Sequence, residues 1–86
     1  MDLNQLRIRI DSIDQQITAL ICKRMKVVRQ IGKYKKKNEI QITDTLREQA
    51  VLERVVSNGK KVGLDTKFMG NLFKLIIEKA KKIQLS

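Results

Sequence analysis

Arg24 and Lys35 are two cations on one predicted helix, and their types and spacing could support chemistry. They are eleven residues apart, a near-whole number of helical turns, so they share a face with Val28 and Ile31 between them. Arg24 also interrupts an apolar stripe, and a guanidinium in such a stripe is costly unless an anion or a set of acceptors meets it. These residues therefore predict a binding site for an anion.

Polar residues also interrupt the apolar faces of two further predicted helices. Asp44 and Glu48 lie on the packing face of one helix, with Arg47 beside them. Gln84 follows Ala80 at helical spacing on the other. Taken singly, each is explained by solvation or by a structural ion pair. Together they predict a small, positively charged cavity inside a helical bundle, suited to a small dianion.

The residue types that are missing narrow the chemistry. The sequence has no His, and its one cysteine, Cys22, has no base partner and is interpreted as a small apolar filler. No carboxylate cluster has metal-ligand spacing, and the four glycines form no phosphate loop. We therefore expect no metal, no cofactor, and no nucleophilic or histidine acid–base catalysis. An enzyme built from these residues would place charges and hydrogen-bond donors around a reactant.

A long helix from Leu6 to Lys35 is predicted to position Arg24. Its stripe advances in alternating steps of four and three and consists of Leu6, Ile10, Ile13, Ile17, Leu20, Arg24, Val27, Ile31 and Tyr34. About 30 residues make a rod of roughly 45 Å, whereas a compact chain of this size has a radius of gyration of roughly 12 Å. A bent or frayed helix would explain this mismatch; we favour a second copy of the chain that covers the overhang.

Capping residues predict where the helices begin. Asp2 or Asn4 can cap the long helix. After a loop from Lys36 to Ile42, Thr43 or Thr45 is predicted to cap a second helix, and Thr45 with Glu48 has capping-box spacing.

The second helix is predicted to end at Asn58-Gly59, because Gly commonly follows a helix C-terminus. Lys60 to Leu64 then forms a turn, and Asp65 caps a third helix with the stripe Met69, Phe73, Ile76, Ala80 and Ile83. The sequence therefore predicts an all-α fold with one long and two shorter helices, in a single domain of residues 1–86.

Composition limits the setting and the partners. With 86 residues the core is marginal alone, so oligomerisation would help. A single Cys, no signal peptide and no membrane-spanning apolar run favour a cytoplasmic protein without membrane contact. The charge of +10 suits an anionic partner. Nucleic acid is disfavoured, because the basic residues are spread over all three helices and only Tyr34, Phe68 and Phe73 could stack on nucleobases.

The combination of motifs resembles the all-helical (AroQ-class) chorismate mutases over almost the whole chain. The matching motifs are Arg7, Ile13-Asp14, Lys23-Arg24, Gly32-Lys33-Tyr34-Lys35, Asp44-Thr45-Leu46-Arg47-Glu48 and Leu75-Ile76-Ile77-Glu78 to Gln84. The resemblance implies an intertwined homodimer of three-helix chains with shared active sites. It also implies that the chain converts chorismate to prephenate in phenylalanine and tyrosine biosynthesis.

The same resemblance implies how the substrate carboxylates are bound. Arg24 and an Arg7 from the other chain would bind the two carboxylates, and Arg47 would help to orient the acids. Ala80 stands where relatives often carry a small hydroxyl residue, so one carboxylate contact would be missing or replaced by water.

The remaining roles implied by the resemblance concern the reacting bond and the substrate hydroxyl. Lys35 and Gln84 would donate hydrogen bonds to the ether oxygen whose bond breaks, and Glu48, with Asp44, would hold the hydroxyl. A Claisen rearrangement is unimolecular and needs neither nucleophile nor metal, in agreement with the residue types that are missing.

Two alternatives remain open from the sequence alone. One is a basic helical module that binds nucleic acid or mediates assembly. The other is a purely structural helical dimer in which Glu48 or Asp44 satisfies Arg24.

Overall fold

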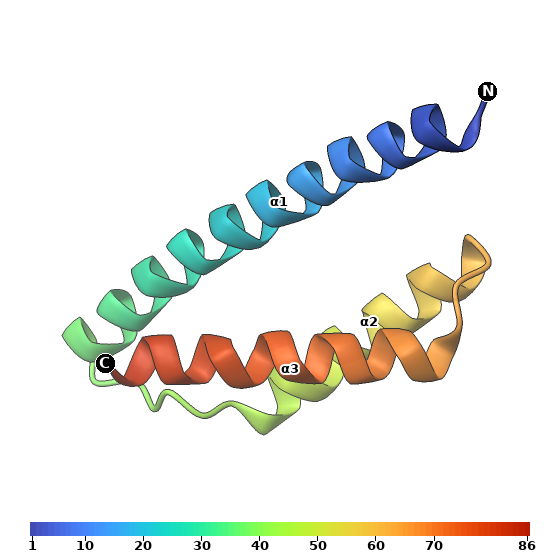
Figure 1. Cartoon of the computed structure of the whole chain (residues 1–86). Coiled ribbons are helices and arrows are strands. Elements are labelled where there is room, and N and C mark those ends of the chain that lie inside the picture. Colours follow the sequence, from blue (N-terminus) through green and yellow to red (C-terminus); the bar gives the residue numbers. More distant parts are fainter.

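The computed structural model describes all 86 residues and consists of three α-helices (Figure 1). These are α1 (Leu3–Lys37), α2 (Thr45–Lys61) and α3 (Thr66–Leu85). The prediction of an all-α fold with one long and two shorter helices is confirmed. No helix is long and apolar enough to cross a membrane.

Helix α1 is uninterrupted over 35 residues and begins at a complete capping box. The Gln5 amide donates to Asp2 Oδ1 at 2.8 Å, and the Asp2 amide donates to Gln5 Oε1 at 3.0 Å. Asp2 rather than Asn4 is therefore the cap. At the other end, Lys36 and Lys37 remain helical instead of starting the predicted loop. Lysine is a good helix former and its charge is favourable at a helix C-terminus, which explains the extension.

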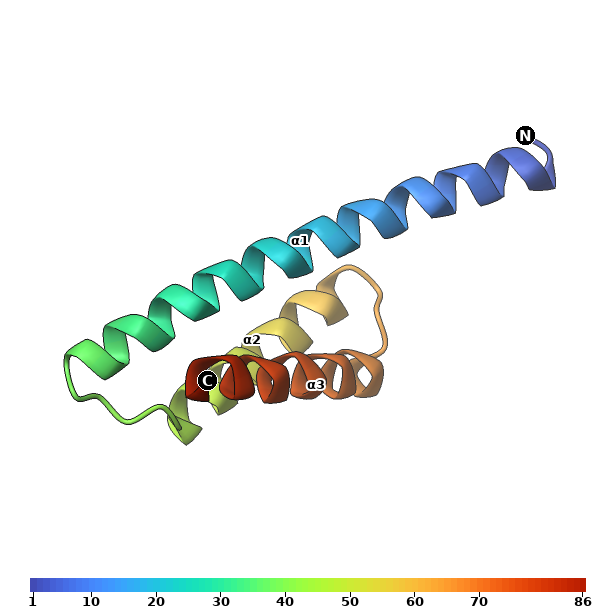
Figure 2. The ribbon, with the colours of Figure 1, turned by 60° about the vertical axis from the view of Figure 1, so that its left-hand side comes forward.

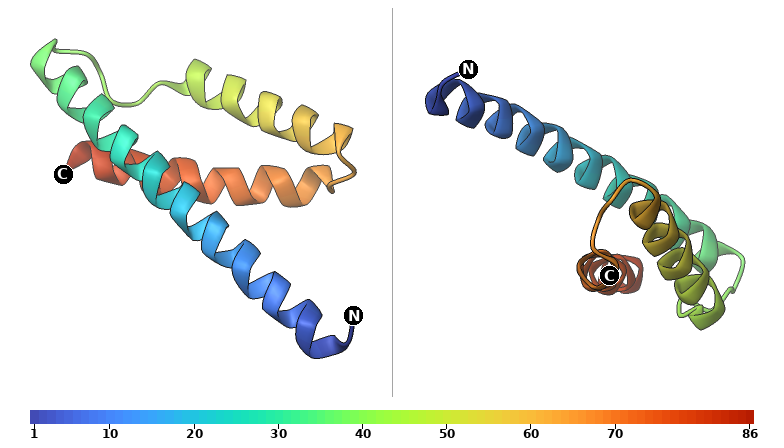
Figure 3. Two further views of the ribbon diagram at one scale, coloured as in Figure 1. Left: turned by 90° about the horizontal axis from the view of Figure 1, so that it is seen from above. Right: turned by 90° about the vertical axis from the view of Figure 1, so that its right-hand side faces the viewer.

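The N-terminal half of α1 stands clear of the rest of the chain (Figures 2 and 3). The molecule measures 55 × 23 × 15 Å, and its Cα radius of gyration is 16.1 Å. Every residue from 1 to 23 is exposed, including the apolar stripe of Leu6, Ile10, Ile13, Ile17 and Leu20. The predicted overhang is confirmed, and the helix is neither frayed nor folded back. Cys22 is exposed in the single chain, so it fills no core position there.

The start of α2 differs from the prediction. Asp44 is the N-cap, and its Oδ1 accepts a hydrogen bond from the Arg47 amide at 2.9 Å, so the predicted caps Thr43 and Thr45 are wrong. A carboxylate both accepts this bond and complements the positive end of the helix dipole, which explains why Asp44 serves. With the cap one residue earlier, Glu48 lies beyond capping-box position, and the predicted Thr45–Glu48 box is absent.

The end of α2 also differs, because Gly59 lies inside the helix. The helix continues to Lys61, and Gly63, at φ +85°, takes the left-handed conformation that the turn requires. Gly59 instead allows close packing of α2 on α3, since a Cβ there would lie 2.9 Å from Met69 Cγ. Asp65 caps α3 as predicted, its Oδ2 accepting from the Phe68 amide at 2.8 Å.

Helix α3 holds the fold together. It packs against both α1 and α2, whereas α1 and α2 do not pack against each other. The buried apolar core consists only of Val28, Val51, Ile77 and Ala80. The space between α1 and α2, closed by α3, is where a cavity can form.

Candidate active site

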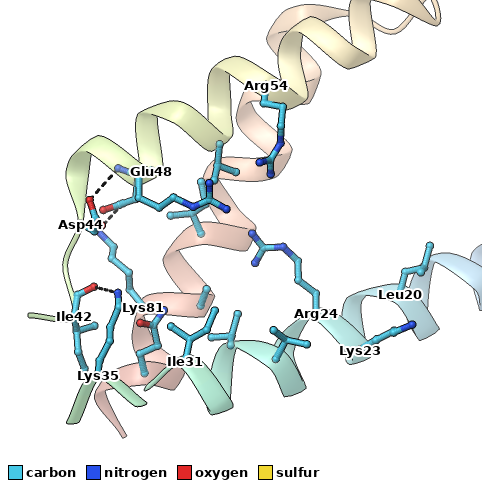
Figure 4. Close-up of a pocket in the computed structure, with 17 residues that line it drawn as sticks. Leu20, Lys23, Arg24, Ile31, Lys35, Ile42, Asp44, Glu48, Arg54 and Lys81 are labelled. Carbon is cyan, nitrogen blue, oxygen red and sulfur yellow. Dashed lines mark hydrogen bonds and ion pairs between the residues drawn. The ribbon is translucent and has the colours of Figure 1, made fainter. Parts of the chain in front are cut away.

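A cavity of about 660 Å³ lies between the three helices (Figure 4). Seventeen residues line it, with apolar side chains such as Val28, Val51 and Ile77 at its base. Its charged residues are the six cations Lys23, Arg24, Lys35, Arg47, Arg54 and Lys81 and the two carboxylates Asp44 and Glu48. The lining is therefore strongly cationic, as the sequence predicted.

Seven of the eight predicted site residues line this cavity. They are Arg24, Lys35, Asp44, Arg47, Glu48, Ala80 and Gln84. The eighth, Arg7, lies near the exposed end of α1, 17 residues before Arg24 and thus about 25 Å away along the axis. The single chain does not bring Arg7 to the cavity.

Arg24 projects from the middle of α1 toward α2 without a carboxylate partner. Partial burial, followed by the nearby charges of Arg47 and Arg54, lowers the pKa of the Arg24 guanidinium, which still remains charged at any ordinary pH. The only ion pair in the chain joins Lys81 to Glu48, and Asp44 caps α2. The alternative in which Glu48 or Asp44 satisfies Arg24 is therefore wrong for this chain, and the guanidinium is free to meet an anion.

Lys35 places a second cation at the other end of the cavity. Its Nζ donates to the backbone carbonyl of Ile42 at 2.9 Å, in a partly buried hydrogen bond (Figure 4). This bond ties the last turns of α1 to the loop before α2. The ammonium group has three N–H donors, so two remain for a ligand.

Glu48 and Gln84 each carry a buried oxygen without a hydrogen-bond partner. These atoms are Glu48 Oε2 and Gln84 Oε1. An unpaired buried polar atom costs free energy and calls for an explanation, and both residues line the same cavity. Both atoms are acceptors, so each calls for a hydrogen-bond donor such as a ligand hydroxyl, while the NH2 group of Gln84 can donate to a ligand acceptor.

Gly32 determines how closely Gln84 approaches α1. A Cβ at Gly32 would lie 3.0 Å from Gln84 Cα, so α3 passes over a notch that only glycine leaves open. This contact holds Gln84 against α1 in the wall of the cavity that Lys35 also lines. Ala80, one turn earlier, is buried and contributes a methyl group without hydrogen-bonding capacity.

Three cavity cations had no predicted role: Lys23, Arg54 and Lys81. Lys81 lies in the lysine-rich last turns of α3, yet its side chain is half-buried and paired with Glu48. Its spacing from Ile77 and Gln84, four and three residues, was the signal that it shares their inward face. Arg54 stands seven residues after Arg47, which likewise places both on one face of α2.

Comparison with known proteins identifies the class to which this fold and cavity belong. The family model described as chorismate mutase type II matches residues 6–85, and the chain belongs to that family. A bifunctional chorismate mutase/prephenate dehydratase of Buchnera aphidicola subsp. Schizaphis graminum is 42% identical over 79 residues, which are 92% of this chain and 20% of that protein. The corresponding bifunctional protein of Escherichia coli K12 is 36% identical over 73 residues, or 85% of this chain and 19% of that protein.

A shorter relative matches over most of its own length. The chorismate mutase of Methanocaldococcus jannaschii is 29% identical over 82 residues, which are 95% of this chain and 83% of that protein. The chain thus spans about a fifth of the length of the bifunctional relatives and corresponds to a chorismate mutase domain.

Proposed function

We propose that the chain converts chorismate to prephenate in this cavity, the reaction that leads toward phenylalanine and tyrosine. The observation that carries the proposal is the set of unmatched groups at one place: an unpaired Arg24 guanidinium and a buried Glu48 oxygen without a donor, in a cavity that Lys35 and the Gln84 amide also line. Chorismate has two carboxylates, a hydroxyl and an ether oxygen, which are the groups that such a cavity would satisfy. Family membership supports the same reaction.

In the proposed site, Arg24 binds one carboxylate and Arg47 helps to orient it. Glu48 accepts a hydrogen bond from the substrate hydroxyl, beside Asp44, of which one oxygen is already taken by the α2 cap. Lys35 and the Gln84 amide donate to the ether oxygen. Ala80 offers no hydroxyl, so a carboxylate there is met by water or by a neighbouring cation.

These residues act through orientation and electrostatics. The substrate must be held in a chair so that its reacting carbons meet, and a closely fitting cavity reduces the entropy lost in that step. Negative charge grows on the ether oxygen as its bond stretches. Lys35 and Gln84 would then bind the transition state more strongly than the ground state, which is the condition for acceleration.

We further propose that the working form is an intertwined homodimer in which Arg7 of the partner completes each site. The support is the exposed apolar stripe on the first half of α1, together with a core too small to stabilise a lone chain well. Two α1 helices packed antiparallel about a two-fold axis would cover both stripes and carry Arg7 of each chain toward the other's cavity.

The direct test is to add chorismate to the purified chain and follow the loss of its absorbance, with light scattering to measure the mass in solution. We expect saturable turnover by a particle of twice the chain mass. A folded chain without turnover would refute the proposed reaction, and an active monomer would refute the shared site.

A further inference from the structure

The ion pair between Lys81 and Glu48 links α3 to α2 inside the cavity wall. Lys81 Nζ lies 3.1 Å from Glu48 Oε1, and the two side chains are 36% and 23% exposed (Figure 4). It is the only ion pair in a chain with nine acidic and nineteen basic residues. Among the nineteen basic residues, Lys81 is thus the one that holds a carboxylate, and this singles it out for a role in the site.

The pair leaves the two oxygens of Glu48 in different states. Oε1 is bound to Lys81, whereas Oε2 is buried and has no partner. A carboxylate with both oxygens free could rotate, and its burial would be costly. With one oxygen bound to an ammonium group, the carboxylate keeps one orientation, and its second oxygen remains available to a donor.

Other nearby cations do not hold Glu48. Lys35 is bonded to the Ile42 carbonyl, and Arg47 forms no ion pair with Glu48 although it is its neighbour in sequence. Lys82, the residue after Lys81, is exposed and does not line the cavity.

We propose that Lys81 is a positioning residue that holds Glu48 so that its free oxygen accepts the hydrogen bond of the substrate hydroxyl. This inference rests on the proposed function. Lys81 thereby makes the site selective for a dianion that carries a hydroxyl at this place, because only such a ligand supplies the donor that Glu48 Oε2 lacks.

The test compares Lys81→Met with wild type on two substrates: chorismate and an analogue in which hydrogen replaces the ring hydroxyl. On chorismate, kcat/KM should fall about tenfold to a hundredfold, the range for losing a hydrogen bond to a charged group. On the analogue, the two proteins should agree within about twofold, since no hydroxyl is there to be held. Lys81→Arg should restore most of the activity, and the exposed control Lys82→Met should behave as wild type.

A second measurement separates positioning from a general effect on folding. In a Glu48→Gln background, Lys81→Met should have little further effect on kcat/KM, because the carboxylate that it positions is gone. If Lys81→Met does not fold, Lys81→Gln replaces it in both comparisons, with circular dichroism as the check. Equal losses on chorismate and on the analogue, or independent losses in the double variant, would overturn the inference.

The outcomes also separate this inference from the proposed function. A wild-type chain that does not convert chorismate refutes the proposed function, and the inference falls with it. If the wild-type chain converts chorismate and Lys81→Met converts it equally well, only the role of Lys81 is refuted and the proposed function stands.

Discussion

Mixed dimers of two inactive variants should recover activity if Arg7 acts across the dimer. Arg7 and Arg24 lie about 25 Å apart along α1 and roughly 100° apart around it, so no small dianion can touch both in one chain. Lys35, by contrast, shares the cavity of its own chain with Arg24. In a shared-site dimer, Arg7→Ala therefore damages the partner's site, whereas Lys35→Ala damages the site of its own chain.

The expected recovery follows from counting sites. Each homodimeric variant has both sites damaged and should be nearly inactive. In a mixed dimer, one site carries both lesions and the other carries none, so each mixed dimer should have about half the activity of a wild-type dimer. Random reassortment of equal amounts makes half of all dimers mixed, so the whole mixture should reach about a quarter of wild-type activity.

The assay is chorismate consumption after the two variants are unfolded together and refolded, with native mass spectrometry to measure the mixed dimers. The matched control mixes Arg24→Ala with Lys35→Ala. Both lesions then fall in the site of their own chain, so every site is damaged and no recovery is expected. If the first mixture recovers nothing although mixed dimers are present, Arg7 acts within its own chain or not at all.

Three further substitutions test individual groups. Arg24→Leu should keep or raise the melting temperature, because it removes a half-buried, unpaired cation, while kcat/KM falls by about a hundredfold or more; near-normal turnover would exclude Arg24 from the site. Gln84→Glu should move the activity optimum to acid, because a carboxyl group donates only while protonated; the rate should be lost as pH rises through its pKa, ordinarily about 4.3, and an unchanged pH–rate profile would contradict the role of Gln84. Gly32→Ala should lower kcat by about tenfold, because the added methyl group pushes Gln84 aside. The control Gly70→Ala, whose Cβ would make only an ordinary contact at 3.8 Å, should keep kcat and raise the melting temperature. Equal kcat values in the two variants would refute the claim that Gln84 needs glycine at position 32.

The existence of the elements and most of the site residues could be read from the sequence because both depend on local spacing. The alternating stripe predicted α1, and Asp65 predicted the start of α3 through a hydrogen bond that spans three residues. Arg24 was conspicuous as the one charged residue in that stripe. Periodicity also placed site residues of α2 and α3 on inward faces, and five of these, together with Arg24 and Lys35 of α1, do line one cavity.

Choices between equivalent neighbours were beyond such reasoning. Asp44, Thr43 and Thr45 are all good caps, and the loop that leads from α1 decides which one meets the helix. Gly59 is of the residue type that commonly follows a helix C-terminus, yet it lies inside α2. Met69 of α3 occupies the space that a side chain at position 59 would need.

The sequence by itself determined three helices, their inward faces and an excess of positive charge, because these follow from interactions within a few residues. Only the tertiary structure decided that α3 packs against both α1 and α2, that Gln84 passes over Gly32, and that Lys81 rather than Lys82 pairs with Glu48. The Gln84–Gly32 and Lys81–Glu48 contacts each join residues more than thirty positions apart in the chain. The packing of α3 likewise brings together helices that are separate in the sequence. Such contacts depend on how the helices cross, and no local pattern specifies that crossing.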